Sequence, residues 1–278
     1  MTVPAIATPG VPSRSGTGPP RFPALRVVEY CARVYRRNWR GTMFMTFFSP
    51  VLFLTAMGAG LGSFVDSGSA AARTLGGVPY AMFLAPGLLA ASAMQVGSFE
   101  TTYPIMARFR WNRVYHAMLT TPIGVRSIVF GQVGWIALRL TLITGVFLTV
   151  MIVFGLVSSP LGVLAVVAGV MTGLSFAAPI MAFTATRRTD EGFSTIFRFV
   201  VIPLYLFSGT FFPLEQLPGP LATLAWLTPT AHGVALARDL TLGRAEVFPS
   251  VAHAGFLALV IAIGVAAALV TFRRALRE

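Results

Sequence analysis

The side chains that could perform catalysis are few and widely scattered along this sequence. Most of its nine acidic residues fall in predicted loops and tails, and its three histidines, His116, His232 and His253, lack the spacing of a metal site. No Ser/His/Asp arrangement, HExxH motif or pair of carboxylates stands out. All 21 basic residues are arginine, so the lysine of the phosphate-binding motif GxxxxGKS/T is missing. The sequence therefore predicts no catalytic site, no metal and no cofactor bound by this chain.

One pair of opposite charges stands out because of its predicted depth. Arg139 lies about eleven residues into an apolar run, roughly 16 Å deep at about 1.5 Å per residue. An arginine inside a membrane is costly unless it pairs or reaches the interface. Glu100, at the inner end of the preceding apolar run, is the nearest candidate partner. Two interpretations stay open: an intramembrane ion pair, or an Arg139 side chain that extends alone to the inner interface.

A second group of candidates occupies the basic and aromatic loop 99–127. Helical spacing would place its side chains on two stripes, one with Met106, Arg110, Arg113 and Ala117 and the other with Trp111, Tyr115 and Met118. A short amphipathic helix of this kind could contact a cytosolic partner. The alternative is a loop whose arginines and aromatic residues only fix the membrane orientation.

A third group surrounds the segment FSGTFFPLEQLP, residues 207–218, which interrupts an apolar run. Pro203 and Pro213 remove backbone donors, and Ser208-Gly209-Thr210 supplies small residues where a helix can end. Glu215 marks the outer membrane boundary, because an ionised carboxylate carries little free-energy cost there and a large one two helical turns deeper in the membrane. The side chains that could line an apolar pathway or outer gate, but could equally face lipid, are Met94, Phe207, Phe211 and Phe212.

Composition decides the environment that these groups share. The chain is 55% hydrophobic and 11% charged, whereas a soluble domain carries about a quarter charged residues. A net charge of +12 could indicate nucleic-acid binding, but the arginines alternate with apolar runs and form no single basic face. The sequence therefore predicts an integral membrane protein that does not bind nucleic acid.

Six apolar runs reach the roughly 20 residues that cross a membrane. They are residues 43–62, 78–98, 128–156, 160–184, 196–214 and 251–271. Sixteen arginines fall on the side of the two termini, three on the other side and two within spans, so both termini are predicted to be cytoplasmic. In the fourth span, Gly169-x-x-x-Gly173 allows close packing against a neighbouring helix.

The segments outside these runs complete the predicted architecture. Residues 1–23 are rich in proline and predict a disordered cytoplasmic tail. The basic stretch ALRVVEYCARVYRRNWRG that follows predicts an interfacial helix with arginines toward anionic lipid headgroups; a short cytosolic helix without membrane contact is the alternative. Residues 215–250 predict short re-entrant or surface-lying helices, because a seventh span would move Arg273, Arg274 and Arg277 outside.

The sequence also resembles a known family. Its stretches FLAPGLL and SGTFFPLEQLP, followed by LTPTAHGV, are similar to the membrane subunit of type 2 ABC exporters. The resemblance covers about residues 25 to 275 and is strongest to the branch of nodulation lipo-oligosaccharide and daunorubicin-type drug export permeases. It implies an all-α integral membrane protein with six transmembrane helices, an N-terminal interfacial helix and a re-entrant outer helical cap between spans 5 and 6, with residues 24–278 as the transmembrane domain.

The resemblance also implies partners and roles. Such subunits pair with a second permease copy or a related permease, and two copies of a separate ABC ATPase, which binds ATP and Mg²⁺, drive them. The family's coupling helix matches the segment with Arg108, Arg110, Trp111, Arg113, Tyr115 and His116. Spans 2 and 5 would flank a pathway for a drug, lipid or glycolipid that works by alternating access in a bacterial plasma membrane. The alternative to a transporter is a scaffold or assembly factor that does not transport. An enzyme that acts on lipids is a third possible function.

Overall fold

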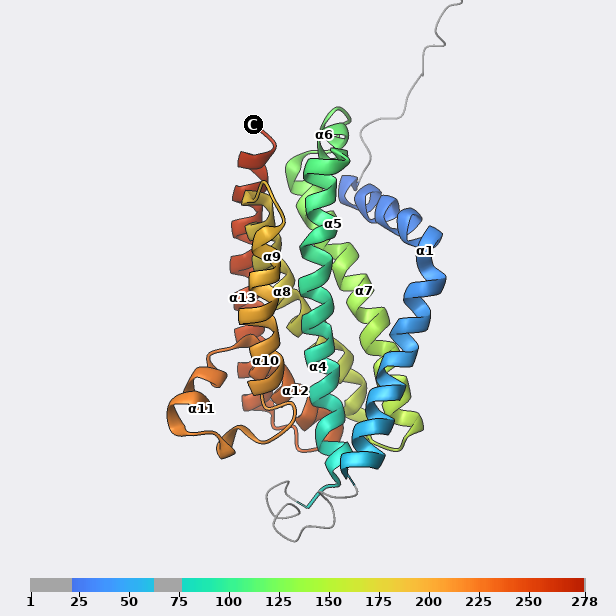
Figure 1. Ribbon diagram of the computed structural model, residues 1–278, viewed down its shortest axis with the longest axis vertical. Coiled ribbons are helices and arrows are strands. Elements are labelled where there is room, and N and C mark those ends of the chain that lie inside the picture. Colours follow the sequence, from blue (N-terminus) through green and yellow to red (C-terminus); the bar gives the residue numbers. More distant parts are fainter. Residues whose placement is uncertain (1–21, 63–76, 278) are drawn as a thin grey trace, which may run out of the picture.

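The computed structural model describes residues 22–62 and 77–277, and every element within these ranges is a helix (Figure 1). The predicted disordered tail, residues 1–23, lies almost wholly outside the described residues. In chain order the elements are α1 (Pro23–Leu54), η1 (Thr55–Leu61), α4 (Tyr80–Thr101), α5 (Tyr103–Met106), η2 (Ala107–Trp111), α6 (Val114–Leu119), α7 (Val125–Val153), η3 (Pro160–Leu164), α8 (Ala165–Thr186), α9 (Glu191–Ile196), η4 (Phe197–Val201), α10 (Ile202–Phe207), η5 (Leu214–Gln216), α11 (Gly219–Trp226), α12 (Pro229–Leu242) and α13 (Val247–Ala275).

Four helical runs in the described part of the chain are long and apolar enough to cross a membrane. They are Tyr80–Trp111, Val125–Val153, Pro160–Thr186 and Val247–Ala275. These runs coincide with the second, third, fourth and sixth predicted spans, which confirms an all-helical membrane protein. The count of six crossings stays a prediction.

The first predicted span is not a separate helix. Helix α1 begins at Pro23 and continues without interruption into the π-helical η1, and Figure 1 shows it bending from an oblique start into the direction of the bundle. The helix therefore continues through residue 43, and the position at which the chain enters the membrane stays a prediction. A single glycine such as Gly41 costs about 1 kcal/mol in a helix and need not end it.

The N-terminal part of α1 is amphipathic, as its sequence predicts. Val27 and Cys31 are buried against α7, and the ring of Tyr35 packs edge-on at 5.8 Å from that of Trp135. Arg26, Arg33, Arg36 and Arg37 lie on the exposed side. Much of the apolar stripe therefore contacts protein, and its contact with lipid stays a prediction.

The fifth predicted span starts and ends earlier than the sequence indicates. Elements α9, η4 and α10 form one helical run from Glu191 to Phe207, in place of the predicted 196–214. The run ends where Ser208 is followed by Gly209 with φ 79°, a conformation that glycine adopts at little cost. A π-helical segment directly precedes Pro203, so this proline shifts the helical ladder without ending the helix.

Helix α8 lies at the centre and packs against α4, α7, α12 and α13. Its contact with α4 is a backbone contact, because a Cβ atom added to Gly97 would collide with the carbonyl of Gly173. A Cβ on Gly173 would lie 2.8 Å from the carbonyl oxygen of Ala93. The close packing predicted from Gly169-x-x-x-Gly173 is thus confirmed, and it fixes α4 and α8 side by side.

The region between the fifth and sixth runs divides into two unlike helices. Helix α11 projects sideways from the bundle (Figure 1), and its Leu221, Leu224 and Leu227 are exposed. Helix α12 instead packs against α4, α8 and α13, and a Cβ on Gly233 would overlap Thr172 of α8. Of the two predicted arrangements, re-entrant and surface-lying, α12 does not follow the surface-lying one, because its small residues let it pack within the bundle. The re-entrant cap stays a prediction.

Candidate functional site

The loop predicted over 99–127 begins as a continuation of α4. The helical run from Tyr80 extends to Trp111, with one irregularity at Thr102, whose ψ of −98° breaks the regular ladder. At that point the hydroxyl of Thr184 in α8 donates a hydrogen bond of 2.8 Å to the carbonyl of Thr101. Helix α8 therefore stabilises the run Tyr80–Trp111 next to its irregularity at Thr102.

The amphipathic helix predicted through residues 106–118 is wrong. The N–H of Asn112 donates to the carbonyl of Ala107 at 2.8 Å, which closes a π-type turn, and Arg113 follows with φ 48° and ψ 31°. This left-handed conformation costs a non-glycine residue about 1–2 kcal/mol and interrupts the helix. The predicted stripe from Met106 to Arg113 is lost as well, because Met106 is buried and Arg113 is exposed.

Part of this segment anchors it to the bundle. Tyr115 is fully buried, and its ring contacts that of Phe109 at 4.8 Å, which in turn contacts Phe272 of α13 at 4.7 Å. Burial raises the pKa of Tyr115, so its phenol stays neutral at physiological pH. Arg108 donates from Nη1 to Oε1 of Gln132 in α7 at 3.1 Å. Arg108 and Tyr115 therefore hold the segment in place.

The other predicted coupling residues lie at or near the surface. The indole of Trp111 is 62% exposed, and Asn112 and Arg113 are exposed beside it; these three residues form the 111–113 tip. Arg110 is half-buried and donates from Nε to the carbonyl of Arg187 at 3.4 Å. The tip is thus a small aromatic and cationic surface, and the buried contacts of Arg108, Phe109 and Tyr115 hold it against the bundle.

The structure brings the predicted charge pair together. Nη2 of Arg139 in α7 lies 3.0 Å from Oε1 of Glu100 in α4, and the two side chains are 8% and 16% exposed. The guanidinium also lies 4.3 Å from the ring centroid of Tyr35 in α1. Of the two interpretations, Arg139 follows the paired one. Its Nε atom is buried without a hydrogen-bond partner among the described residues.

Sequence reasoning missed the neighbours of this pair. Gln132 donates from Nε2 to Sγ of Cys31 in α1 at 3.5 Å while it accepts the hydrogen bond from Arg108. A signal was present, because Gln132 precedes Arg139 by seven residues and therefore shares its face of α7. The two polar contacts connect α1, α7 and the run that ends at the tip.

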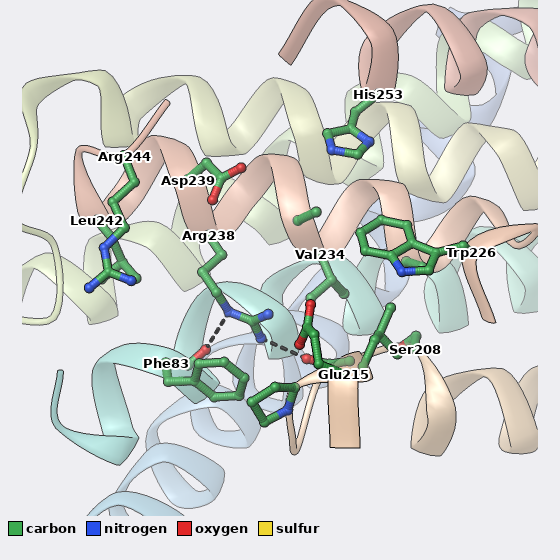
Figure 2. A pocket seen from close by; sticks show the side chains of 15 residues that line it. Phe83, Ser208, Glu215, Trp226, Val234, Arg238, Asp239, Leu242, Arg244 and His253 are labelled. Carbon is green, nitrogen blue, oxygen red and sulfur yellow. Dashed lines mark hydrogen bonds between the residues drawn. The ribbon is translucent and has the colours of Figure 1, made fainter. Parts of the chain in front are cut away.

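Arg238 lies in a position that its sequence does not predict. It falls in the region predicted to form short outer helices, and it stands on the packed helix α12, where it donates from Nε to the carbonyl of Phe83 at 3.1 Å and from Nη2 to the carbonyl of Gly209 at 2.7 Å (Figure 2). Its Cζ also lies 3.7 Å from the ring centroid of Phe83. One guanidinium thus connects α12, α4 and the turn after α10.

A cavity of about 350 Å³ lies beside this guanidinium. Figure 2 shows its lining side chains, which come from α4, the turn after α10, η5, α11, α12 and α13. They include two arginines, Arg238 and Arg244, two carboxylates, Glu215 and Asp239, and the rings of Trp226 and His253. The cavity is therefore polar and aromatic, with its charges balanced.

The residues predicted to form a pathway or outer gate do not gather in one place. Only Glu215 lines the cavity. Met94 is fully buried and accepts a hydrogen bond from Thr230 at 3.1 Å. Phe211 packs against Tyr205 at 5.4 Å. Phe207 is 49% exposed, and its ring centroid lies 6.4 Å from that of Phe212; neither residue lines the cavity.

Two of the three histidines, which are far apart in the sequence, are in contact. Nδ1 of His232 lies 2.8 Å from Nδ1 of His253, and Nε2 of His232 lies 2.9 Å from the carbonyl of Trp226. The carbonyl can only accept, so His232 donates from Nε2 and accepts at Nδ1 from His253. Burial, assisted by His253, lowers the pKa of His232. No group of three or more potential metal ligands occurs within the described ranges.

Comparison with known proteins agrees with this arrangement. Residues 26–242 match the family model described as ABC-2 type transporter. The chain is 34% identical over 239 residues to nodulation protein J of Rhizobium leguminosarum bv. trifolii, which covers 83% of this chain and 87% of the relative. It is 33% identical to nodulation protein J of Rhizobium meliloti, over 76% of this chain and 80% of the relative, and 32% identical to that of Neorhizobium galegae, over 88% and 93%.

The family match and the helical architecture lead to the same conclusion. The matched region begins in α1 and ends with α12, so it includes the charge pair, the 111–113 tip and the Arg238 contacts. Each alignment covers most of this chain and most of the related protein. The chain therefore belongs to the ABC-2 type transporter family, as a transmembrane subunit of an ABC transporter.

Proposed function

We propose that this chain is the membrane permease of an exporter that a separate ABC ATPase drives. The observation that carries the proposal is the 111–113 tip, where exposed Trp111 and Arg113 stand on the buried Phe109–Tyr115 aromatic contact. A docked partner that displaces this surface would also displace the helices beneath it, because the aromatic contacts join the tip to α13. Two ATPase copies bind ATP and Mg²⁺, and this chain supplies no nucleotide site.

The pathway lies between two permease subunits, either two copies of this chain or one copy with a related permease. In this proposal α1 with η1, and the run from α9 to α10, cross the bacterial plasma membrane in addition to the four long apolar runs. Both termini are cytoplasmic, and α11 and α12 form the outer cap, with α12 as its re-entrant part. ATP binding closes the ATPase pair, the tip carries the motion into α4, and the gate between the permeases opens outward.

The cargo is a hydrophobic or amphiphilic molecule such as a drug, a lipid or a glycolipid. The low charge of the helices supports this class, since a highly polar polymer would find few partners along them. Several related proteins are named for nodulation, and a signal molecule exported to a host is one cargo that fits such a name. A scaffold or assembly factor without transport is the second candidate, supported only by the absence of a recognisable catalytic constellation among the described residues.

The decisive experiment is coexpression with candidate ABC ATPases from the same organism, starting with any that a neighbouring gene encodes. We expect a stable complex in which the ATPase turnover changes when candidate lipids or drugs are added. The variant R113E should reduce copurified ATPase severalfold, because it reverses the charge of the tip. The control R277E makes the same change at an exposed site after α13 and should leave the ratio intact. Two results would argue for the scaffold: a complex that forms normally with R113E, or an ATPase turnover that no added compound changes.

A further inference from the structure

A groove of about 270 Å³ opens where three helix ends meet, near the C-terminal end of α13. Arg110 reaches it from η2, Arg188 from the segment directly after α8, and Arg274 from the last turn of α13. Thr186, Thr271 and two alanines complete the lining. Three guanidinium groups from separate elements therefore converge on one concave surface.

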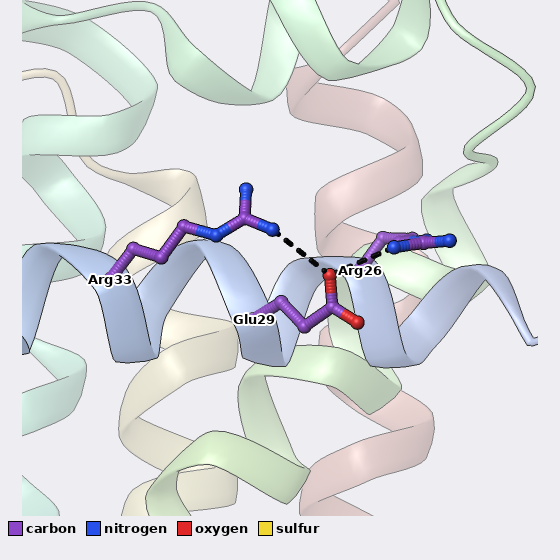
Figure 3. A network of polar contacts seen from close by, with 3 residues as sticks. All are labelled: Arg26, Glu29 and Arg33. Atoms are coloured by element: carbon purple, nitrogen blue, oxygen red, sulfur yellow. Dashed lines mark hydrogen bonds and ion pairs between the residues drawn. The ribbon is translucent and has the colours of Figure 1, made fainter.

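The lining of this groove contains no acidic residue. Within the described ranges, no carboxylate forms an ion pair with any of its three arginines. The arginines at the start of α1 differ, because Arg26 and Arg33 lie 3.0 and 3.4 Å from the same oxygen of Glu29 (Figure 3). The groove is thus a concentration of positive charge that no carboxylate in its lining offsets, unlike the paired arginines at the start of α1.

The helix ends offset only part of this charge. Each helix C-terminus carries the equivalent of about half a negative charge, so three ends leave an excess of roughly one to two positive charges. Arg110 uses Nε for the carbonyl of Arg187, which leaves its two terminal nitrogens available. Guanidinium groups match phosphate oxygens in geometry as well as in charge. The groove is therefore suited to one phosphate group with one or two negative charges.

The position of the groove selects the source of that phosphate. Three of the four runs long enough to cross a membrane end at the groove: Tyr80–Trp111, Pro160–Thr186 and Val247–Ala275. The ends of spanning helices lie at the depth of lipid headgroups. We propose that the groove binds the phosphate of an anionic phospholipid, whose acyl chains lie along the apolar outer surface of α13. Val270 and Ile263 are exposed on that surface.

The test uses the full chain purified in a non-ionic detergent and titrated with phosphatidylglycerol, with bound lipid counted by native mass spectrometry. We expect one lipid to bind at least tenfold more tightly than any further lipid, and at least tenfold more tightly than phosphatidylcholine. The variant R188Q/R274Q should weaken this first site at least tenfold. R36Q/R37Q removes the same charge from the exposed side of α1 and should leave the first site unchanged.

Further arms separate the alternatives. R188K/R274K keeps the charge and should retain part of the affinity, which distinguishes lost binding from lost folding. The proposal is overturned if R36Q/R37Q lowers the affinity as much as R188Q/R274Q does, because the binding is then a general response to charge. It is overturned equally if inorganic phosphate displaces the lipid at concentrations near the lipid's own Kd, since the site then holds a soluble anion.

Discussion

Glu100 and Arg139 form a contact whose value depends on both partners being present. Their atoms meet at 3.0 Å with little solvent access, so removing one charge leaves the other buried and unpaired. We expect E100Q and R139Q each to lower the free energy of unfolding by about 3 kcal/mol. The double variant should cost clearly less than the sum. Chemical unfolding in detergent micelles measures the cycle, and strictly additive effects would show that the pair contributes nothing.

The contribution of Arg238 to stability should depend more on the shape of its guanidinium group than on its positive charge. A lysine keeps the positive charge but cannot donate to two carbonyls on different elements while it stacks on Phe83. We expect R238K to cost about 1.5–3 kcal/mol, the contribution of a hydrogen bond to a charged group. It should also expose residues 208–218 to limited proteolysis. R126K, at an exposed site in α7, is the matched control, and equal protease resistance in both variants would contradict the clamp.

These two arginines show what could and could not be predicted at this scale. Glu100 could be named as a candidate partner of Arg139, because few carboxylates lie near an arginine deep in an apolar run, but the sequence alone did not decide between this pair and an arginine that reaches the interface. The partners of Arg238 are two backbone carbonyls, which every residue type carries, so no sequence pattern indicates them. The contact between His232 and His253 depends in the same way on how α12 packs on α13.

At the scale of elements, the contact between α4 and α8 leaves no room for a side chain. We expect G97A to destabilise the protein by about 1–3 kcal/mol, because its Cβ would displace the backbone of Gly173. G145A is the matched control in α7, where a Cβ meets no atom within 4 Å, and alanine should be neutral or stabilising by up to about 1 kcal/mol. Thermal unfolding of both variants measures the difference. Equal melting temperatures would mean that α8 can move away freely.

Helical periodicity predicted the long elements well and the short ones poorly. Runs of 20 or more apolar residues identify helices by composition alone. The break at Arg113 could not be found in this way, because it depends on a left-handed residue that is not glycine. The sequence left two arrangements open for α12, because small residues such as Gly233 are compatible with a surface position and with close packing, and only the facing Thr172 decides between them.

At the scale of the whole molecule, the single cysteine makes the orientation testable. Cys31 is buried, so a C31A background should fold and carry no reactive thiol. A cysteine at Leu224, which is 61% exposed on α11, should react with a membrane-impermeant maleimide in intact cells. R113C at the opposite end should react only after permeabilisation. The reverse pattern would place the 111–113 tip outside the cell and exclude a cytosolic ATPase as its partner.

The irregularity at Thr102 divides the long run from Tyr80 to Trp111 into a fixed shaft and a short lever. The tip lies nine residues beyond this pivot, about 14 Å at about 1.5 Å per residue, so a rotation of roughly 10° moves it by about 2 Å. The hydrogen bond from Thr184 restrains the pivot on the side of α8. A force applied at the tip is therefore shared between bending at Thr102 and tilting α4 together with α8. The hydrogen bond from Thr184, the contact of Arg108 with Gln132 and the packing of Phe109 on Phe272 all oppose the bend.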